Sequence, residues 1–176
     1  ASLILTGMKG KGKIKSFFMG STTKELISNA PCPVLAIPEK QEFKQLNIIV
    51  YATAFEQEDI MAISKLSKIA SFFEAKIKII HVSPLNENDG VTQLEWFKEM
   101  LLQHVKYNNI DFNIYSSNDT IYFLRLYLNE VKADMVAMLE RKSNKTFFNK
   151  FFHNDLVKQM ETLAELPLIS FNDKNF

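Results

Sequence analysis

The sequence is poor in the residues that mark several specialised classes of protein. A single cysteine, Cys32, excludes an intramolecular disulfide, so nothing in the composition argues against a reducing cytoplasm. No run approaches the roughly 18 apolar residues of a membrane-spanning helix, and the first residues lack the order of a signal peptide. The formal net charge of +1 gives no reason to expect nucleic acid or an anionic membrane surface as an obligatory partner.

Glycine is scarce as well, and its distribution is uneven. Only five glycines occur, and all but Gly90 lie near the start of the chain, at Gly7, Gly10, Gly12 and Gly20. Residues 1–40 hold six lysines against Glu25 and Glu39, a net charge of +4, whereas the remainder holds fifteen basic and eighteen acidic residues, a net charge of −3. The first forty residues are therefore a different kind of segment from the rest.

From Asn47 onward, short β-rich runs alternate with segments of helical periodicity, which is typical of βαβ units around a parallel sheet. Asp119 is a candidate N-cap for the third of the expected helices. We predict an α/β fold, a Rossmann-like open parallel five-stranded sheet with helices on both faces. The expected strands are residues 48–52, 75–82, 112–115, 134–138 and 167–171, and the expected helices centre on 60–73, 94–105, 121–131 and 152–163.

The segment before this domain reads as one βαβ unit. Its elements are a strand over residues 2–5, a helix capped by Ser21, and a strand over 31–38. One such unit is far too small to bury a hydrophobic core by itself.

An internal repeat explains this incomplete unit. Residues 1–7 (ASLILTG) align with 133–139 (ADMVAML), and 17–26 align with 151–160. The strand opening Pro33-Val34-Leu35 aligns in the same way with Pro167-Leu168-Ile169. We therefore interpret residues 1–38 as the C-terminal βαβ remnant of a first domain, 39–46 as a linker, and 47–172 as a complete second domain. On this interpretation the chain is an N-terminally truncated piece of a tandem-domain protein.

The glycine-rich loop has a regular spacing, G-x2-G-x9-G-S, formed by Gly7, Gly10, Gly20 and Ser21 between a strand and a helix. Glycines let the backbone approach a phosphate closely, and main-chain N–H groups at a helix start favour an anion. The lysines among residues 9–15 add positive charge. The alternative interpretation is a tight turn closed by a helix cap, with the lysines in solvent.

This motif, followed by PCPVLAIP (31–38), resembles the C-terminal signature of the universal stress protein family, and residues 47–172 are similar to a whole domain of that family in element order. The resemblance implies a cytoplasmic α/β protein that dimerises and, in a subset of members, binds ATP. It also implies that Gly7, Gly10, Gly20 and Ser21 are the phosphate-binding positions, with Thr22 as a weaker candidate.

The second domain departs from the family pattern at two places. Ala54 stands where the resemblance implies an acidic residue that contacts the base or ribose. The glycine loop is also lost, because Leu139 replaces the first glycine, Lys142 or Ser143 the second, and Asn154-Asp155 the final Gly-Ser. We therefore expect ATP only where the missing half of the first domain is present, and no nucleotide in residues 47–172.

Other chemically interesting residues form no recognisable catalytic or metal site. His81, His104 and His153 lack the spacing of metal ligands, and Cys32 has no partner that would make it a nucleophile. The basic loop at Arg141, Lys142, Lys145 and Lys150 either holds an anion or, as we favour, is solvated. We expect its aromatic neighbours to fill the empty nucleotide cleft of the second domain or its core. These neighbours are Phe147, Phe148, Phe151 and Phe152.

Three function classes remain open on this sequence. The favoured one is a nucleotide-responsive stress protein with a non-binding structural or regulatory second domain. The alternative is a ligand-free dimerisation or interaction scaffold, and an enzyme is disfavoured because no catalytic residue stands out. For both the stress protein and the scaffold, we expect the chain to associate with itself through antiparallel pairing of 33–37 with 167–171, within one chain or between two. We expect no nucleic acid or membrane partner.

Overall fold

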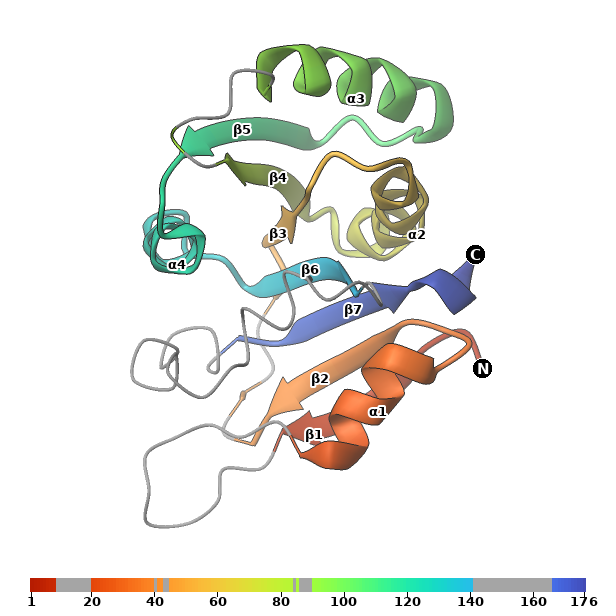
Figure 1. The fold of residues 1–176 in the computed structure, drawn as a ribbon. Helices are drawn as coiled ribbons and strands as arrows, with labels where there is room; N and C mark the ends of the chain where they lie inside the picture. The colour runs from red at the N-terminus through yellow and green to blue at the C-terminus, as the bar shows by residue number, and fades with distance from the viewer. Residues whose placement is uncertain (9–19, 40, 43–44, 84, 86–89, 141–165) are drawn as a thin grey trace. The chain divides into compact units, whose positions relative to one another are not determined.

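The computed structural model describes residues 1–8, 20–39, 41–42, 45–83, 85, 90–140 and 166–176. They group into two compact units (Figure 1). Unit 1 comprises Ala1–Lys44 together with Glu140–Phe176, and unit 2 comprises Gln45–Leu139. The expected fourth helix of the second domain, residues 152–163, lies outside the described residues.

Unit 2 contains a parallel sheet with the strand order β6-β3-β4-β5. Its strands are β3 (Ile48–Ala52), β4 (Lys76–Ser83), β5 (Ile110–Ser116) and β6 (Met135–Glu140). Its helices are α2 (Gln57–Phe73), α3 (Gly90–His104) and α4 (Thr120–Glu130). The predicted α/β class with parallel strands is confirmed, and the expected bounds of these elements hold to within a few residues.

Helices cover both faces of this sheet, as predicted. The Lys98 ammonium of α3 lies 5.2 Å from the centroid of the Phe112 ring on β5. The Tyr115 ring, three residues further along β5, lies 5.6 Å from the ring of Tyr127 on α4. Side chains an odd number of residues apart on a strand point to opposite faces, so α3 and α4 lie on opposite sides of the sheet (Figure 1).

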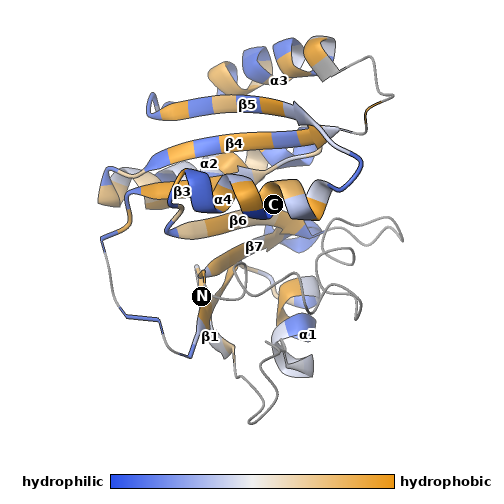
Figure 2. Cartoon of the chain, turned by 90° about the vertical axis from the view of Figure 1, so that its left-hand side faces the viewer, coloured by the Kyte–Doolittle hydropathy of each residue, from blue (hydrophilic) through white to orange (hydrophobic). Residues whose placement is uncertain are grey.

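The core of unit 2 follows from the periodicity of the helices and the apolar runs of the strands. Burial along β4 alternates at first and is continuous from Ile79 to Ser83, whereas β5 at the sheet edge alternates apolar and polar residues from Ile110 to Ile114 (Figure 2). The side chain of Asp119 accepts a hydrogen bond from the Tyr122 N–H at 2.9 Å and confirms the predicted N-cap of α4. Helix residues of the predicted faces that are buried are Ile60, Ile63, Leu66, Ala70, Phe97, Leu101, Ile121, Leu124 and Leu128.

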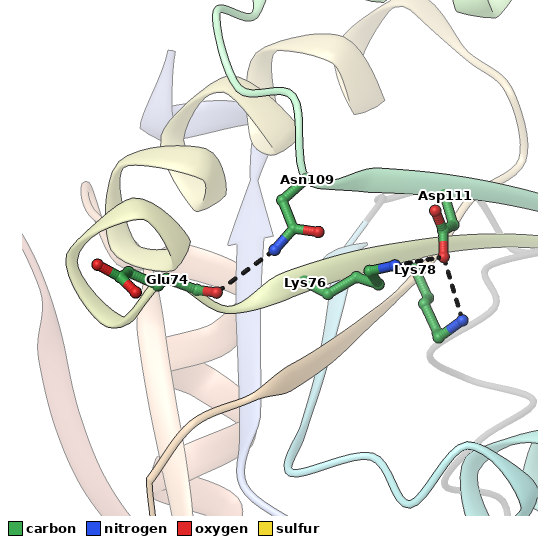
Figure 3. Close-up of polar contacts among 5 residues, drawn as sticks. All are labelled: Glu74, Lys76, Lys78, Asn109 and Asp111. Carbon is green, nitrogen blue, oxygen red and sulfur yellow. Dashed lines mark hydrogen bonds and ion pairs between the residues drawn. The ribbon is translucent and has the colours of Figure 1, made fainter.

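A charged cluster joins the edge strand β5 to its neighbour β4 (Figure 3). The Asp111 carboxylate on β5 accepts from the ammonium groups of Lys76 and Lys78 on β4, at 3.2 and 3.3 Å. Burial raises the pKa of Asp111, but the hydrogen bonds and positive charges of the two lysines outweigh it and hold the pKa below its ordinary value. The charged pairs also make this edge of the sheet unfavourable for further strand addition.

Unit 1 consists of β1 (Ile4–Met8), α1 (Ser21–Asn29), β2 (Val34–Pro38), β7 (Leu168–Asn172) and a final 3-10 turn, η3 (Asp173–Asn175). β1 pairs with β2 in parallel, which makes the predicted βαβ unit. The strand expected over residues 2–5 begins two residues later and continues to Met8.

The antiparallel pairing predicted between 33–37 and 167–171 is present within the chain. β2 and β7 pair with Val34 opposite Ser170, Leu35 opposite Ile169 and Ala36 opposite Leu168. In the internal repeat, residues 34, 35 and 36 correspond to 168, 169 and 170. Val34 therefore faces the counterpart of Ala36, Ala36 faces the counterpart of Val34, and Leu35 faces its own counterpart. Such self-complementary contacts define a local two-fold axis, here between Leu35 and Ile169.

Among the described residues, no helix is long and apolar enough to cross a membrane. The chain from Glu39 to Asn47, where it is described, contains neither helix nor strand. The assignment of residues 39–46 to a linker stays a prediction, as do the domain boundaries on either side.

Leu168→Asp tests the pairing of β2 with β7. Leu168 is buried and directly opposite Ala36, so an aspartate there places an unpaired carboxylate in the core of unit 1. We expect a loss of several kcal/mol in the free energy of unfolding measured with urea, together with proteolytic cleavage within residues 1–38. Leu5→Asp is the control, because Leu5 on β1 is exposed. Equal effects of the two substitutions would contradict the pairing of β2 with β7.

Candidate functional site

The described part of the glycine motif lies at the end of β1 and the start of α1. Gly7 is the fourth residue of β1, and Gly20 is the N-cap of α1 with an extended backbone, φ −57° and ψ 154°. A Cβ atom added to either glycine would meet no heavy atom within 4 Å. Neither packing nor a positive φ therefore requires glycine at these two positions.

The start of α1 differs from the sequence prediction by one residue. Ser21 was predicted as the N-cap, but Gly20 holds that position and Ser21 is the first helical residue. The reason is that the Gly20 carbonyl already accepts the first helical hydrogen bond, from the Lys24 N–H at 3.1 Å. Because glycine has no side chain to cap the helix, the N–H groups of the first turn are left for solvent or a ligand.

A threonine pair brings the two halves of this site together. The hydroxyls of Thr6 on β1 and Thr23 on α1 lie 3.3 Å apart, and Thr23 is buried. This contact fixes the first turn of α1 beside the end of β1, while Ser21 and Thr22 remain exposed. The arrangement presents the positive end of a helix and two glycines at one place, which suits an anion such as phosphate. Gly10, the remaining predicted site residue, lies outside the described residues, as do the lysines of residues 9–15.

In unit 2, the turn after β3 is organised by a buried carboxylate that the sequence analysis missed. Asp59 of α2 is 1% exposed. Its Oδ1 accepts from the Tyr51 hydroxyl at 2.8 Å, and its Oδ2 accepts from the Thr53 hydroxyl at 2.8 Å. Oδ2 also accepts from the backbone N–H groups of Ala54 and Glu56, each at 3.2 Å. An acidic residue three positions after the helix N-cap was the sequence signal for such a contact.

These bonds explain what takes the place of the acidic residue missing at position 54. Ala54 itself is half-buried, and its N–H points to Asp59. The Asp59 carboxylate accepts from the Tyr51 hydroxyl of β3 and from three donors of the turn, so it is occupied by four hydrogen bonds within the protein. The turn after β3 is therefore held by a buried structural carboxylate.

An aromatic stack closes the same end of the sheet. The Phe55 ring lies 4.4 Å from the imidazole of His81 and 5.1 Å from the ring of Phe97, measured between centroids. Phe55 has a φ of 59°, a backbone conformation that costs energy in a residue with a large side chain. The Phe55 N–H donates to the Thr53 hydroxyl at 2.8 Å, which helps to hold that conformation.

His81 is a buried imidazole. Its Nδ1 lies 2.9 Å from the Thr53 carbonyl oxygen, so Nδ1 carries the proton and donates. Its Nε2 is buried without a hydrogen-bond partner in the described structure. The aromatic residues predicted to fill this region, Phe147, Phe148, Phe151 and Phe152, lie outside the described residues together with the basic loop and His153.

Glu140 at the end of β6 is a second buried acid. It aligns with Met8 in the repeat, one residue after the position where the first copy has Gly7 and the second has Leu139. Its Oε2 is buried and has no hydrogen-bond partner in the described structure, and burial raises the pKa of Glu140 to about 7. Where the first copy begins a glycine loop, the second copy thus buries an acidic side chain.

Within the described ranges, no group of three or more His, Cys, Asp or Glu residues is placed to hold a metal ion. Cys32 is a buried free cysteine. His104 is exposed, and its Nδ1 lies 2.8 Å from the Met100 carbonyl oxygen, which is a contact within α3.

Comparison with known proteins shows what this chain is similar to. Residues 1–38 match the sequence profile of the universal stress protein family. The protein of Thermus aquaticus named "universal stress protein in QAH/OAS sulfhydrylase 3′ region" is 43% identical over 37 residues, which are 21% of this chain and 27% of that protein. A crystal structure of a universal stress protein from Archaeoglobus fulgidus shares the fold with a TM-score of 0.69 at 17% identity. The two sequence matches thus cover about a fifth of this chain, and the likeness to the solved structure shows a shared fold.

The fold likeness to universal stress proteins covers both units. The Archaeoglobus fulgidus match includes 97% of this chain and 62% of that one, so this chain spans less than two thirds of that protein. A universal stress protein solved in complex with cAMP shares the fold with a TM-score of 0.54 at 14% identity, over 73% of this chain and 98% of that one. The profile match, by contrast, ends with β2 at the residue where the predicted first-domain remnant ends.

Asp59→Ala tests the structural role of the buried carboxylate. The substitution leaves the hydroxyls of Tyr51 and Thr53 buried without their acceptor, which costs roughly 2–4 kcal/mol of unfolding free energy. Glu58→Ala is the matched control, because Glu58 is an exposed acid on the same helical turn and its removal changes stability by about 0.5 kcal/mol or less. Urea denaturation measures both. Similar losses in the two variants would argue against the network.

Glu140→Gln tests the raised pKa. The pKa in the fold lies above the ordinary value of 4.5, so folding favours the neutral acid and wild-type stability falls as the pH rises from 4.5 through about 7. Glutamine stays neutral, so the variant becomes more stable than wild type above pH 7, by up to about 3 kcal/mol, and the difference shrinks near pH 4. Urea denaturation at pH 4.5 and pH 8 measures it, with the exposed Glu130→Gln as control. A difference in unfolding free energy between Glu140→Gln and wild type that is the same at both pH values would contradict the raised pKa of Glu140.

Proposed function

We propose that this chain is part of a tandem-domain universal stress protein whose first domain holds an ATP-type nucleotide. Residues 1–38 supply its phosphate side, through Gly7, Gly10, Gly20, Ser21 and Thr22. The strands and helices that hold the base and ribose precede residue 1 in a longer protein. No residue is assigned a catalytic role, and the proposed activity is nucleotide binding.

The observation that carries this proposal is the combination of motif and geometry at the start of α1. The family profile covers the segment that contains the G-x2-G-x9-G-S spacing. In the structure, the Cβ positions of Gly7 and Gly20 face open space, and the first turn of α1 is fixed beside them by Thr6 and Thr23. A fold that does not itself need glycine there is consistent with a ligand that does.

The nucleotide class has support from a structural neighbour. The universal stress protein solved with cAMP contains an adenine nucleotide with a phosphate, on a fold shared with 73% of this chain. ATP is the finer assignment, and it rests on the family resemblance of the glycine loop together with the positive charge of the lysines in residues 9–15.

For the second domain we propose a structural or regulatory role without nucleotide. Ala54 lacks the acid of the family pattern, and the nearby Asp59 carboxylate is occupied by its own turn. Phe55 and His81 stack at the same end of the sheet. These observations favour a closed site.

A ligand-free interaction scaffold is the second candidate, and the β2–β7 pairing favours it. The same self-complementary register is available between two copies of the chain, because residues 1–38 and 168–172 are joined only through unit 2 and the linker. Nucleotide that co-purifies with the longer protein would decide against this candidate.

Calorimetry with ATP tests the nucleotide proposal. We expect this chain to bind ATP only weakly, because it lacks the base and ribose side of the site, whereas the longer protein binds it and loses binding on Gly10→Val. Gly12→Val is the matched control, since Gly12 lies in the same loop at a position that the motif leaves free. Micromolar ATP affinity in this chain would refute the missing-half argument, and equal effects of the two valines would refute the motif assignment.

A further inference from the structure

The C-terminal end of α1 is closed by the last residues of the chain. Asn172 donates from Nδ2 to the carbonyl oxygens of Ile27 at 2.8 Å and Ala30 at 3.0 Å. Asn175 donates from Nδ2 to the same Ala30 carbonyl at 3.0 Å. Carbonyls at a helix end have no partner within the helix, and here two side-chain amides satisfy them across more than 140 residues of sequence. We call Asn172 and Asn175 the amide clasp.

The orientation of both clasp amides is determined by their other bonds. Asn172 Oδ1 accepts from the Lys174 N–H at 2.9 Å and from Asn175 Nδ2 at 3.0 Å. Asn175 Oδ1 accepts from the Asn172 N–H at 3.1 Å. Because an oxygen must face each of these donors, the two NH₂ groups must face the helix carbonyls. Both residues are buried, at 1% and 5% exposed, where an amide without partners would be costly.

The clasp residues belong to the second repeat, and the helix that they hold belongs to the first. By the alignment of residues 34–35 with 168–169, Asn172 corresponds to Pro38 and Asn175 to Gln41. Proline has no side-chain donor, and the Gln41 amide donates instead to the Glu42 carbonyl at 3.2 Å. The second repeat therefore supplies the clasp to α1, the helix that follows the intact glycine motif, and among the described residues the equivalent positions of the first repeat make no such contact.

The other end of α1 is the proposed phosphate end. α1 has only nine residues, and an isolated helix of this length is not stable in water. In the described structure, its placement therefore depends on the Thr6–Thr23 contact near its start, the buried Ile27, and the clasp at its end. The carbonyls that the clasp holds, those of Ile27 and Ala30, lie between about 1.4 and 2.5 helical turns from Thr22 and Ser21.

We propose that Asn172 and Asn175 are positioning residues for the phosphate-facing first turn of α1, so that the C-terminal residues of the second repeat complete the anion site of the first. This inference rests on the proposed function. It adds that the second repeat contributes to binding without touching the ligand.

The test uses the full chain and Asn172→Asp. Aspartate has nearly the same shape but no NH₂ group, and its carboxylate would face two carbonyl oxygens. Two quantities are measured, the hydrogen exchange of the backbone amides in residues 21–29 and the dissociation constant for inorganic tripolyphosphate by ³¹P NMR titration. We expect exchange at least tenfold faster at Lys24 and Glu25, the first amides of α1 that donate helical hydrogen bonds, and a dissociation constant at least fivefold higher than in wild type.

Two controls separate positioning from general loss of stability. Asn108→Asp makes the same chemical change at an exposed loop position and leaves both quantities unchanged. Leu168→Ala destabilises β7 without removing a clasp donor, so at an equal loss of stability it weakens tripolyphosphate binding less than Asn172→Asp. Asn175→Ala, which removes one donor to Ala30, replaces Asn172→Asp if that variant does not fold.

The outcomes are distinguishable. Unchanged exchange at Lys24 and Glu25 in the clasp variants overturns the inference, whatever happens to binding. Loss of affinity no greater than in Leu168→Ala also overturns it, because the clasp would then act only through stability. A wild-type chain that binds no tripolyphosphate, with exchange still accelerated in the variants, refutes the proposed phosphate site while leaving the coupling of the clasp to α1 intact.

Discussion

The antiparallel pairing of β2 with β7 is the interaction on which the rest of unit 1 depends. A single βαβ unit has too little apolar surface to form a core, so β2 needs a neighbour on its free edge. β7 supplies it, and in doing so brings Asn172 and Asn175 to the end of α1. Because the partner strand lies more than 130 residues away in sequence, this neighbour comes from the far end of the chain.

The pairing also shows how two copies of one backbone pattern have diverged. Leu35 and Ile169 face each other at a local two-fold axis, and the two strands have corresponding bounds in the repeat. Away from the axis, the chemistry differs. The first copy has Gly7 and Met8 where the second has Leu139 and a buried Glu140 without a hydrogen-bond partner in the described structure. The symmetry is that of the backbone, and the proposed site belongs to one copy only.

In unit 2, polar groups near the end of β3 serve the fold. Asp59 accepts one hydrogen bond from Tyr51 of β3 and three from its own turn, and the His81 imidazole donates to the Thr53 carbonyl and stacks on Phe55. A carboxylate so fully occupied has no remaining strong acceptor for a ligand. The aromatic stack and the strained backbone of Phe55 add to this picture of a site closed by its own residues. These contacts are consistent with the structural role proposed for the second domain.

The alternation of strands and helices and the two-sided sheet could be predicted from local periodicity, and the pairing of the two final strands from the repeat together with the family resemblance. The glycine motif was also visible as a spacing. The buried network of Asp59 and the stacking of Phe55 on His81 could not be predicted, since they depend on which side chains meet across different elements. The amide clasp is the clearest case. Asn172 and Asn175 form an unremarkable polar C-terminus in the sequence, and only the long-range pairing of β2 with β7 places their amides against the carbonyls of α1.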